Sequence, residues 1–461
     1  MTDARTPDAK PGAAALAWIN ANTGRLTAVS DRLWELAEVA LEEFESARLL
    51  EGELAAAGFT VVSGVAGMPT AFTATWGQGR PVLGFLAEYD ALPLLSQEAL
   101  PVRKPLREGA PGHGCGHNLY GAAVLGAVLA LKEEMVRENL PGTIVFFGCP
   151  AEETLVGKVL MARAGLFDGL DAALTWHPSE LNSLWAASSQ AMNSAKFAFH
   201  GRAAHAAASP DQGRSALDAV ELMNVGANYL REHVPQDTRL HYVITKGGVA
   251  PNIVPAEAEV WYYVRSPRRA DVDSIYARLL KIAEGAALMT ETSFTVNLIT
   301  SCREYLPNDV LGDLLMDCLT RLGPPTWTAD ELAFAQAITD TFAPGQKEGS
   351  LRAGQVPPSY WGKLLDDTIC PPLARGECLP GSTDVADASW ATPTACSVAC
   401  CAPLGTAGHS WQFTATSGMS IGHKGLLLSA KVLAMAGSEL LRRPEILVKA
   451  REEYGRKTAS Y

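Results

Sequence analysis

The stretch Thr143-Ile144-Val145-Phe146-Phe147-Gly148, which leads into Cys149-Pro150-Ala151-Glu152-Glu153, decides the fold of this chain. Its four consecutive large apolar residues are typical of a strand that is buried on both faces. Similar apolar runs occupy residues 82–87 and 172–175, and helical patterns that begin near residues 118 and 158 separate the three runs. Apolar strands that alternate with helices predict an α/β fold, with a mostly parallel sheet covered by helices on both faces.

Acidic and histidine side chains follow these strands directly. Glu88 and Asp90 come after the strand at 82–87, Glu152 and Glu153 after the strand at 143–148, and His177 after the strand at 172–175. Open α/β sheets bind their ligands at the carboxyl ends of the strands. We therefore expect the active site at this edge of the sheet.

A different order of elements begins after about residue 190. The order β-α-β-β-α-β is that of a ferredoxin-like α+β module. We expect a catalytic domain in two parts, residues 1–192 and 304–461, and an inserted lid or dimerisation domain at residues 193–303. The expected strands of the insert are 196–200, 239–245, 257–264 and 293–298, and its expected helices are 215–232 and 271–288.

Three further patterns belong to the catalytic domain. Apolar residues spaced as one helical face run from Thr27 to Ala57 and predict a single long helix there. Helices and loops are expected from Asn308 onward, and the Gly- and Pro-rich residues 343–380 predict surface loops.

The composition weighs against several classes of function. A formal charge of −12 disfavours nucleic-acid binding, because phosphates demand a basic face. No apolar stretch reaches the roughly 20 residues that span a bilayer, and the N-terminus lacks the pattern of a secretory signal. Nine scattered cysteines fit reduced thiols, so we expect a cytoplasmic protein.

The segment Gly112-His113-Gly114-Cys115-Gly116-His117-Asn118 places a thiol and an imidazole two residues apart. A buried thiol beside a hydrogen-bonded histidine would explain the pair structurally. Its position between a strand and a helix that face other candidate groups favours a metal site instead. Sulfur and imidazole with a carboxylate suit zinc, cobalt or manganese better than calcium or magnesium.

Other side chains can complete such a site. Glu152 and Glu153 are adjacent in a turn and can point differently, so one would bind a metal while the other accepts a proton. His177 follows a strand, and either His409 or His423 would supply a later imidazole. One thiolate, three imidazoles and a carboxylate suffice to hold two metal ions roughly 3.5–4 Å apart.

A series of motifs in one order carries a resemblance. The motifs are Ala87–Pro93 (AEYDALP), Gly112–Asn118, Pro150–Glu153, Trp176–Pro178, His200–Ala206 (HGRAAHA), Gly247–Pro255 (GGVAPNIVP), Gly381–Asp384 and His409–Gln412. Over nearly its whole length the chain resembles the dinuclear metallo-aminoacylase and carboxypeptidase family, in the branch that contains aminobenzoyl-glutamate hydrolase and the amidohydrolases of indole-acetyl amino acids.

The resemblance implies a set of metal ligands and a general base. Cys115, His117, Glu153, His177 and His409 would hold two divalent metal ions, zinc or manganese. Glu152 would act as general base and then as general acid.

The resemblance also implies residues that contact the substrate. His205 would reach the substrate and the developing oxyanion, either across a dimer or across a closing hinge. Asn252, Arg265 and Asp384 would bind the substrate, and the inserted domain would form a homodimer. Asn118 and the triplet Ser382-Thr383-Asp384 depart from the wider family and are expected to adjust substrate choice.

The expected activity is metal-dependent hydrolysis of the amide between an acyl group, preferably aromatic, and an amino acid with a free carboxylate. A small N-acyl amino acid such as p-aminobenzoyl-glutamate fits this expectation best. An indole-acetyl-amino-acid hydrolase or a dipeptidase of the same fold stays open, as does a non-catalytic metal-binding partner subunit. Thiol catalysis by Cys115 with His117 is disfavoured, because a two-residue separation is awkward for activating that thiol.

Overall fold

The computed structural model describes residues 11–459, which fall into two compact units. The larger unit contains the chain up to Ala187, Leu306–Glu377 and the chain from Ala388 onward. The smaller unit contains Ser188–Tyr305 and Cys378–Asp387. The predicted boundaries at residues 193 and 303 stay a prediction, and the short segment Cys378–Asp387 had no sequence signal that would join it to the insert.

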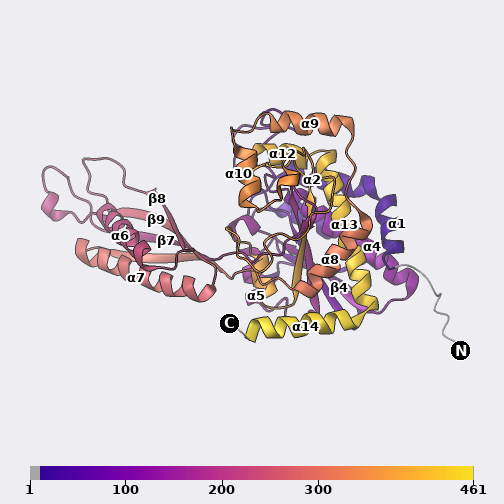
Figure 1. Cartoon of the computed structure of the whole chain (residues 1–461). Helices are drawn as coiled ribbons and strands as arrows, with labels where there is room; N and C mark the ends of the chain where they lie inside the picture. The colour runs from indigo at the N-terminus through magenta and orange to yellow at the C-terminus, as the bar shows by residue number, and fades with distance from the viewer. Residues whose placement is uncertain (1–10, 460–461) are drawn as a thin grey trace. The chain divides into compact units, whose positions relative to one another are not determined.

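A seven-stranded sheet forms the centre of the larger unit (Figure 1). Its strand order is β1-β2-β4-β3-β5-β11-β6, in which β4, β3, β5 and β11 run parallel and the outer strands pair antiparallel. The predicted α/β fold with a mostly parallel sheet is confirmed. The strands are β1 (Thr60–Ser63), β2 (Phe72–Gln78), β3 (Val82–Glu88), β4 (Gly142–Cys149), β5 (Ala172–Ser179), β6 (Ser183–Leu184) and β11 (Thr394–Cys400).

The helix α4 (His117–Glu138) is central to the core of this unit. It is buried continuously from His117 to Leu131, and it packs against α13, α1, α2 and the sheet. The approach of α2 is so close that a Cβ on Gly126 would lie 2.7 Å from Leu26 Cδ1, so glycine is required there. The other helices of this unit are α1 (Ala13–Ala21), α2 (Thr23–Leu36), α3 (Phe44–Ala56), α5 (Gly157–Arg163), α8 (Asp309–Leu322), α9 (Ala329–Thr339), α10 (Gln346–Ala353), α12 (Trp411–Ser417), α13 (Ser420–Arg442) and α14 (Pro444–Ala459).

Three sequence predictions about this unit need correction. The single helix predicted from Thr27 to Ala57 is two helices, because Ala37 adopts a left-handed conformation with φ 43°. The strand β11 was not predicted, although it pairs in parallel with β5 in the sheet. The predicted loops at 343–380 contain α10 and a small core of their own around Leu351 and Tyr360.

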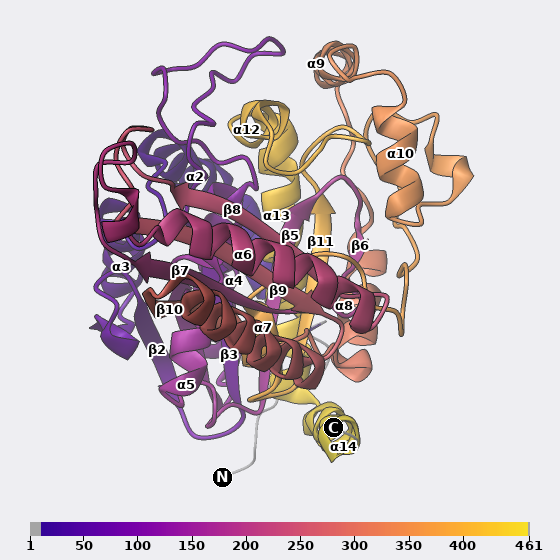
Figure 2. The same ribbon diagram turned by 90° about the vertical axis from the view of Figure 1, so that its left-hand side faces the viewer.

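The smaller unit is a four-stranded antiparallel sheet with two helices. Its strand order β10-β7-β9-β8 and the succession β-α-β-β-α-β confirm the ferredoxin-like module. The helices α6 and α7 pack side by side against one face of the sheet (Figure 2). The elements are β7 (Ala191–His200), α6 (Ala216–Leu230), β8 (Arg239–Lys246), β9 (Glu257–Ser266), α7 (Arg269–Thr290) and β10 (Ser293–Cys302), and the short helix α11 (Val385–Ser389) begins in the segment Cys378–Asp387.

Among the described residues, none of the helices combines the length and the apolar character needed to cross a bilayer.

Candidate metal centre

The predicted metal ligands come from four separate segments of the larger unit. His177 lies on β5, Glu153 lies in the turn after β4, and His409 lies in the loop between β11 and α12. Cys115 and His117 stand at the start of α4, on either side of Gly116. Gly116 has φ 76°, and a Cβ there would lie 3.0 Å from both Phe413 and Pro178, so the tight entry into α4 requires glycine.

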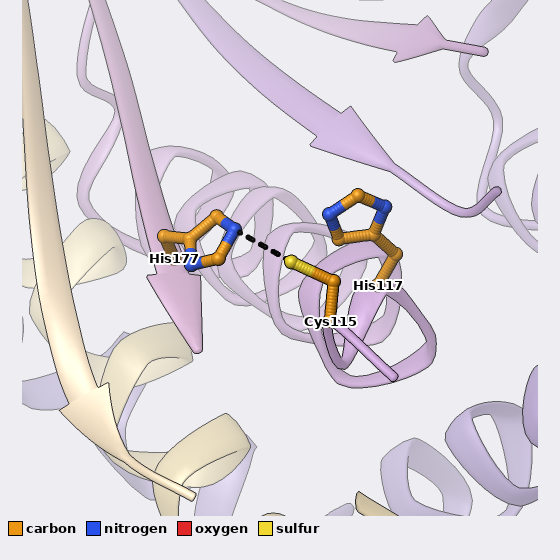
Figure 3. Close-up of side chains that lie close together, drawn as sticks. All are labelled: Cys115, His117 and His177. Carbon is orange, nitrogen blue, oxygen red and sulfur yellow. Dashed lines mark hydrogen bonds between the residues drawn. The ribbon is translucent and has the colours of Figure 1, made fainter. Parts of the chain in front are cut away.

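Two groups of metal-binding atoms share the sulfur of Cys115. One group is Cys115, His117 and His177, and the other is Cys115, Glu153 and His409; within each, the ligand atoms all lie within 4.8 Å of one another. Figure 3 shows the sulfur between the two imidazoles, with Sγ 3.4 Å from His177 Nε2. His409 Nε2 lies 3.3 Å from Glu153 Oε2. The structure thus brings together all five predicted ligands.

A backbone contact brings His409 to this centre. The His409 amide donates to the Gly114 carbonyl at 3.0 Å, and His409 itself adopts φ 58°. Its rival His423 lies elsewhere, with Nε2 2.8 Å from Asp31 Oδ1. Local sequence could not separate the two histidines, because the distinguishing contact is made over nearly 300 residues of chain.

Neighbouring acceptors orient two of the imidazoles. Asp90 Oδ1 lies 2.9 Å from His117 Nδ1, and Asp90 Oδ2 accepts the Glu153 amide at 2.9 Å. His177 Nδ1 lies 2.7 Å from the Pro178 carbonyl. These contacts direct the Nε2 atoms of both histidines into the centre, the arrangement that metal-binding histidines commonly have.

Burial and mutual repulsion shift the pKa values in the metal-free centre. Burial raises the pKa of Glu153 to about 10, and the nearby Glu152, Asp90 and Glu88 carboxylates add to the shift. Burial also holds the pKa of the Cys115 thiol well above its usual value. It lowers the pKa of His117 to about 4 and that of His177 to about 3, so both imidazoles are neutral near pH 7. Neutral imidazoles are the form that binds a metal.

The donors present fit divalent metal ions. His117 Nε2 and Glu153 Oε1 are buried and make no hydrogen bond in the described structure. Buried polar atoms in proteins almost always have a partner, and these two face other ligand atoms. The donor set of sulfur, imidazole nitrogen and carboxylate oxygen is typical of zinc and of other first-row transition metals.

Glu152 stands beside the five ligands but belongs to neither group that contains Cys115. It forms a separate group with His117 and Glu88, with one atom of each within 4.8 Å of the others. Its side chain is 8 % exposed, so it is close to the centre and nearly dry. A carboxylate in this position can move a proton next to the metal ligands.

The smaller unit holds the other predicted residues. The segments of His205 and Asn252 pair with each other: His205 bridges to Ile253, and the Ala206 amide donates to the Asn252 carbonyl at 3.0 Å. Both side chains are exposed, and His205 Nδ1 accepts the amides of Ala207 and Ala208.

Arg265 lies on β9 and donates to Ser382 Oγ at 3.2 Å. Asp384, two residues further on, is fully buried, and its charge contributes to a raised pKa of the Cys302 thiol. The roles of these residues toward a substrate stay predictions.

Sequence reasoning missed three residues and misjudged the setting of a fourth. Glu88, Asp90 and Lys158 are buried at the centre, and only the acidic pair had a signal, its position at the end of β3. Asn118, expected to adjust substrate choice, is buried in the core, where its amide donates to Ser30 Oγ and to the Ser417 carbonyl.

A buried carboxylate on the His409 loop predicts a pH effect on stability. Glu180 accepts the Gly405 amide, and burial raises its pKa from 4.5 to about 7 against the opposing effects of that bond and of Lys347. The folded protein therefore keeps a proton that the unfolded chain loses, and stability falls as the pH rises from 4.5 to 7. The change is at most about 3 kcal/mol.

We expect Glu180→Gln to flatten this part of the stability profile. Urea unfolding of the metal-free protein at pH 5 and pH 8 measures it, and Glu42→Gln, at an exposed site, is the matched control. An equal loss of stability between the two pH values in parent and Glu180→Gln would contradict the assignment.

Comparison with known proteins agrees with this geometry. Residues 188–290 match the family of peptidase dimerisation domains, M20 type. The chain is 42 % identical over 447 residues to one of the two kinds of p-aminobenzoyl-glutamate hydrolase subunit of Escherichia coli strain K12, covering 95 % of this chain and 93 % of the relative. It is 29 % identical to Xaa-Arg dipeptidase of Mus musculus, covering 93 % of this chain and 89 % of that protein.

Solved structures share the fold at low sequence identity. An aminobenzoyl-glutamate utilization protein from Klebsiella pneumoniae superposes with a TM-score of 0.63 at 16 % identity, covering 93 % of this chain and 98 % of that one. A dinuclear metal-binding peptidase of Bacillus subtilis from the M20 family gives a TM-score of 0.58 at 16 % identity, covering 92 % and 99 %.

The fold and the ligand groups define a hydrolase of the metallopeptidase type. The chain belongs to the M20 peptidase family.

Proposed function

We propose that this protein hydrolyses the amide bond between an acyl group, preferably aromatic, and an amino acid with a free carboxylate, as in p-aminobenzoyl-glutamate. The observation that carries the proposal is the pair of ligand groups sharing Cys115, with Glu152 beside them. A site built only to hold metal has no use for an additional buried carboxylate at that place.

The proposed cofactors are two divalent metal ions, zinc or manganese. Cys115, His117 and His177 would hold one, and Cys115, Glu153 and His409 the other, so that the thiolate bridges them. When bound, such ions supply a Lewis acid for the scissile carbonyl and lower the pKa of a water molecule.

The residues of the chain then carry the proton and hold the substrate. Glu152 takes a proton from the attacking water and delivers it to the departing amine, which leaves a carboxylate and a free amino acid. His205 and Asn252 would donate to the developing oxyanion, an effect worth about 3–4 kcal/mol for a good donor. Arg265 and Asp384 would take part in binding the amino-acid part of the substrate, with the guanidinium of Arg265 suited to its carboxylate.

The names of the relatives support the substrate class. The relative at 42 % identity is named for p-aminobenzoyl-glutamate, and a relative at 29 % identity over 252 residues is named indole-3-acetyl-aspartic acid hydrolase. Both names describe an aromatic acyl group on an acidic amino acid. The second candidate is a dipeptidase, which the likeness to Xaa-Arg dipeptidase over 93 % of this chain favours.

The active form that we propose is a cytoplasmic homodimer assembled through residues 188–290. The match of this segment to peptidase dimerisation domains supports a dimer. The strand β8 is an edge strand, and its exposed Tyr242, Val243 and Ile244 would suit a second sheet. The nine cysteines are all free thiols, which supports the reducing cytoplasm. A related but different chain is the alternative partner, since the E. coli relatives are named as two distinct subunits of one hydrolase.

A substrate panel with metal removal tests the function. We expect hydrolysis of p-aminobenzoyl-glutamate and other N-acyl-Glu or N-acyl-Asp compounds at least tenfold faster than of neutral or Arg-containing dipeptides. Chelation should abolish turnover, and zinc or manganese should restore it. A clear preference for dipeptides would move the assignment to the second candidate.

Two other results would overturn the proposal altogether. Full metal content without hydrolysis of any acyl amino acid would indicate a non-catalytic protein, provided that the mixture with a related partner chain is also tested. Turnover that survives chelation would indicate thiol chemistry.

A further inference from the structure

A buried ion pair lies directly beside the metal ligands. Lys158, at the start of α5, places Nζ 2.7 Å from Oε1 of Glu88, the last residue of β3. The side chains are 0 % and 1 % exposed. A lysine this deeply buried is rare, because its ammonium loses nearly all of its hydration, so the pair needs a reason beyond surface charge.

The second oxygen of Glu88 faces the metal ligands. Glu88 Oε2 lies 3.3 Å from His117 Nε2, the same nitrogen that belongs to the group with Cys115 and His177. Glu88 therefore stands within ligand range of the position that His117 would share with a metal. Its other oxygen is engaged by Lys158, which draws the carboxylate toward the ammonium.

The charges of the centre depend on this lysine. Five acidic side chains converge there, from Cys115, Glu152, Glu153, Asp90 and Glu88. If all five are ionised, two divalent cations balance four of them, and the ammonium of Lys158 balances the fifth. A low-dielectric centre strongly favours such neutrality, since unbalanced buried charge is costly.

We propose that Lys158 is a positioning residue that holds Glu88 off the metal ions and, by neutralising it, sets the metal affinity of the centre. The inference rests on the proposed function only in its claim that the centre binds divalent metal. Glu88 is then a carboxylate that becomes an additional ligand when Lys158 is removed.

The two halves of the pair should act in opposite directions. Glu88→Gln leaves the ammonium without its counter-charge beside the metal ligands, so it repels divalent cations. Lys158→Met leaves a carboxylate without its counter-charge at the same place, so it attracts them and adds an oxygen ligand. The double variant removes both charges and should resemble the parent.

Metal affinity is measured by titrating zinc and manganese into the metal-free protein in competition with a chelator. We expect Glu88→Gln to weaken the affinity at least tenfold and Lys158→Met to strengthen it at least tenfold, more for manganese because the added ligand is oxygen. The double variant should lie within about threefold of the parent. Glu452→Gln and Lys449→Met make the same charge changes on the exposed face of α14 and should leave both affinities unchanged.

The design separates a charge effect from a structural one. If both single variants weaken metal binding, or neither changes it, the inference is wrong. Should Lys158→Met not fold, as far-UV circular dichroism would show, the comparison of Glu88→Gln with the double variant still decides: adding Lys158→Met must restore affinity. A parent that binds no metal would overturn the proposed function itself, whereas a parent that binds two ions without the opposite shifts overturns only this inference.

Discussion

Glu152→Gln should lower kcat by about a thousandfold while the protein keeps its full metal content. Glu152 is nearly buried and lies within ligand distance of His117, yet it is absent from both groups that share Cys115. Its proposed task is therefore proton transfer and not metal binding. Proton transfer by a positioned side chain contributes typically 10²–10⁴-fold to a rate. Glutamine keeps the size and the hydrogen-bonding oxygen but cannot accept the proton of the attacking water.

The measurement combines steady-state kinetics with metal analysis on the same sample. KM should change little, because the loss is confined to the transition state. Glu153→Gln is the matched control, since the adjacent carboxylate is a proposed ligand: it should lose metal along with activity. Turnover within tenfold of the parent, with metals bound, would remove Glu152 from the mechanism.

The neighbouring carboxylates illustrate how far sequence alone reaches. The apolar strand before Glu152 and Glu153 placed them at the carboxyl edge of a parallel sheet, and β4 ends there. The same argument placed His177 and the pair Glu88 and Asp90. Strand ends are predictable because continuous apolar runs mark parallel strands and the topology brings their carboxyl ends to one edge.

Elements decided by long-range contacts could not be predicted in the same way. The apolar spacing of α2 and α3 stays in phase across their junction, so nothing local marks the break at Ala37. The turn after it is held by Glu43, whose carboxylate accepts the distant Ala151 amide at 2.8 Å. The strand β11 has the sequence Thr-Ala-Cys-Ser-Val-Ala-Cys, whose small residues lack a strong strand signal, and its pairing with β5 decides its structure.

Lys158 shows why part of the centre escaped prediction. A lysine in the first turn of a helix is normally solvated, and its sequence neighbours give no sign that it enters the core. Its burial follows from Glu88, seventy residues earlier in the chain, which supplies the counter-charge. A residue whose partner is set by tertiary packing has no local pattern that identifies it.

Cys115→Ala should abolish binding of both metal ions, whereas His409→Ala should weaken mainly one of them. Cys115 belongs to both ligand groups, and His409 belongs only to the group that contains Glu153. Removing a bridging thiolate leaves each ion with two of its three proposed protein ligands and takes a negative charge from the centre. We expect hydrolysis to fall by about a thousandfold or more at metal concentrations that saturate the parent. Equilibrium dialysis with metal analysis measures the number of ions bound, and Cys149→Ala, which replaces another buried thiol, is the control.

Proton release gives this prediction a second readout. Because the pKa of the Cys115 thiol lies well above its usual value and that of Glu153 is about 10, both groups are protonated near pH 7.5 without metal. Binding must displace these protons, so metal affinity should rise with pH, and calorimetry in buffers of different ionisation enthalpy counts the protons released. A variant such as Cys115→Ser, if it still binds metal weakly, should release one proton fewer than the parent. Parent-like affinity for two ions in Cys115→Ala, with unchanged proton release, would show that the thiol is not a ligand, and the shared-sulfur geometry would then have no part in the chemistry.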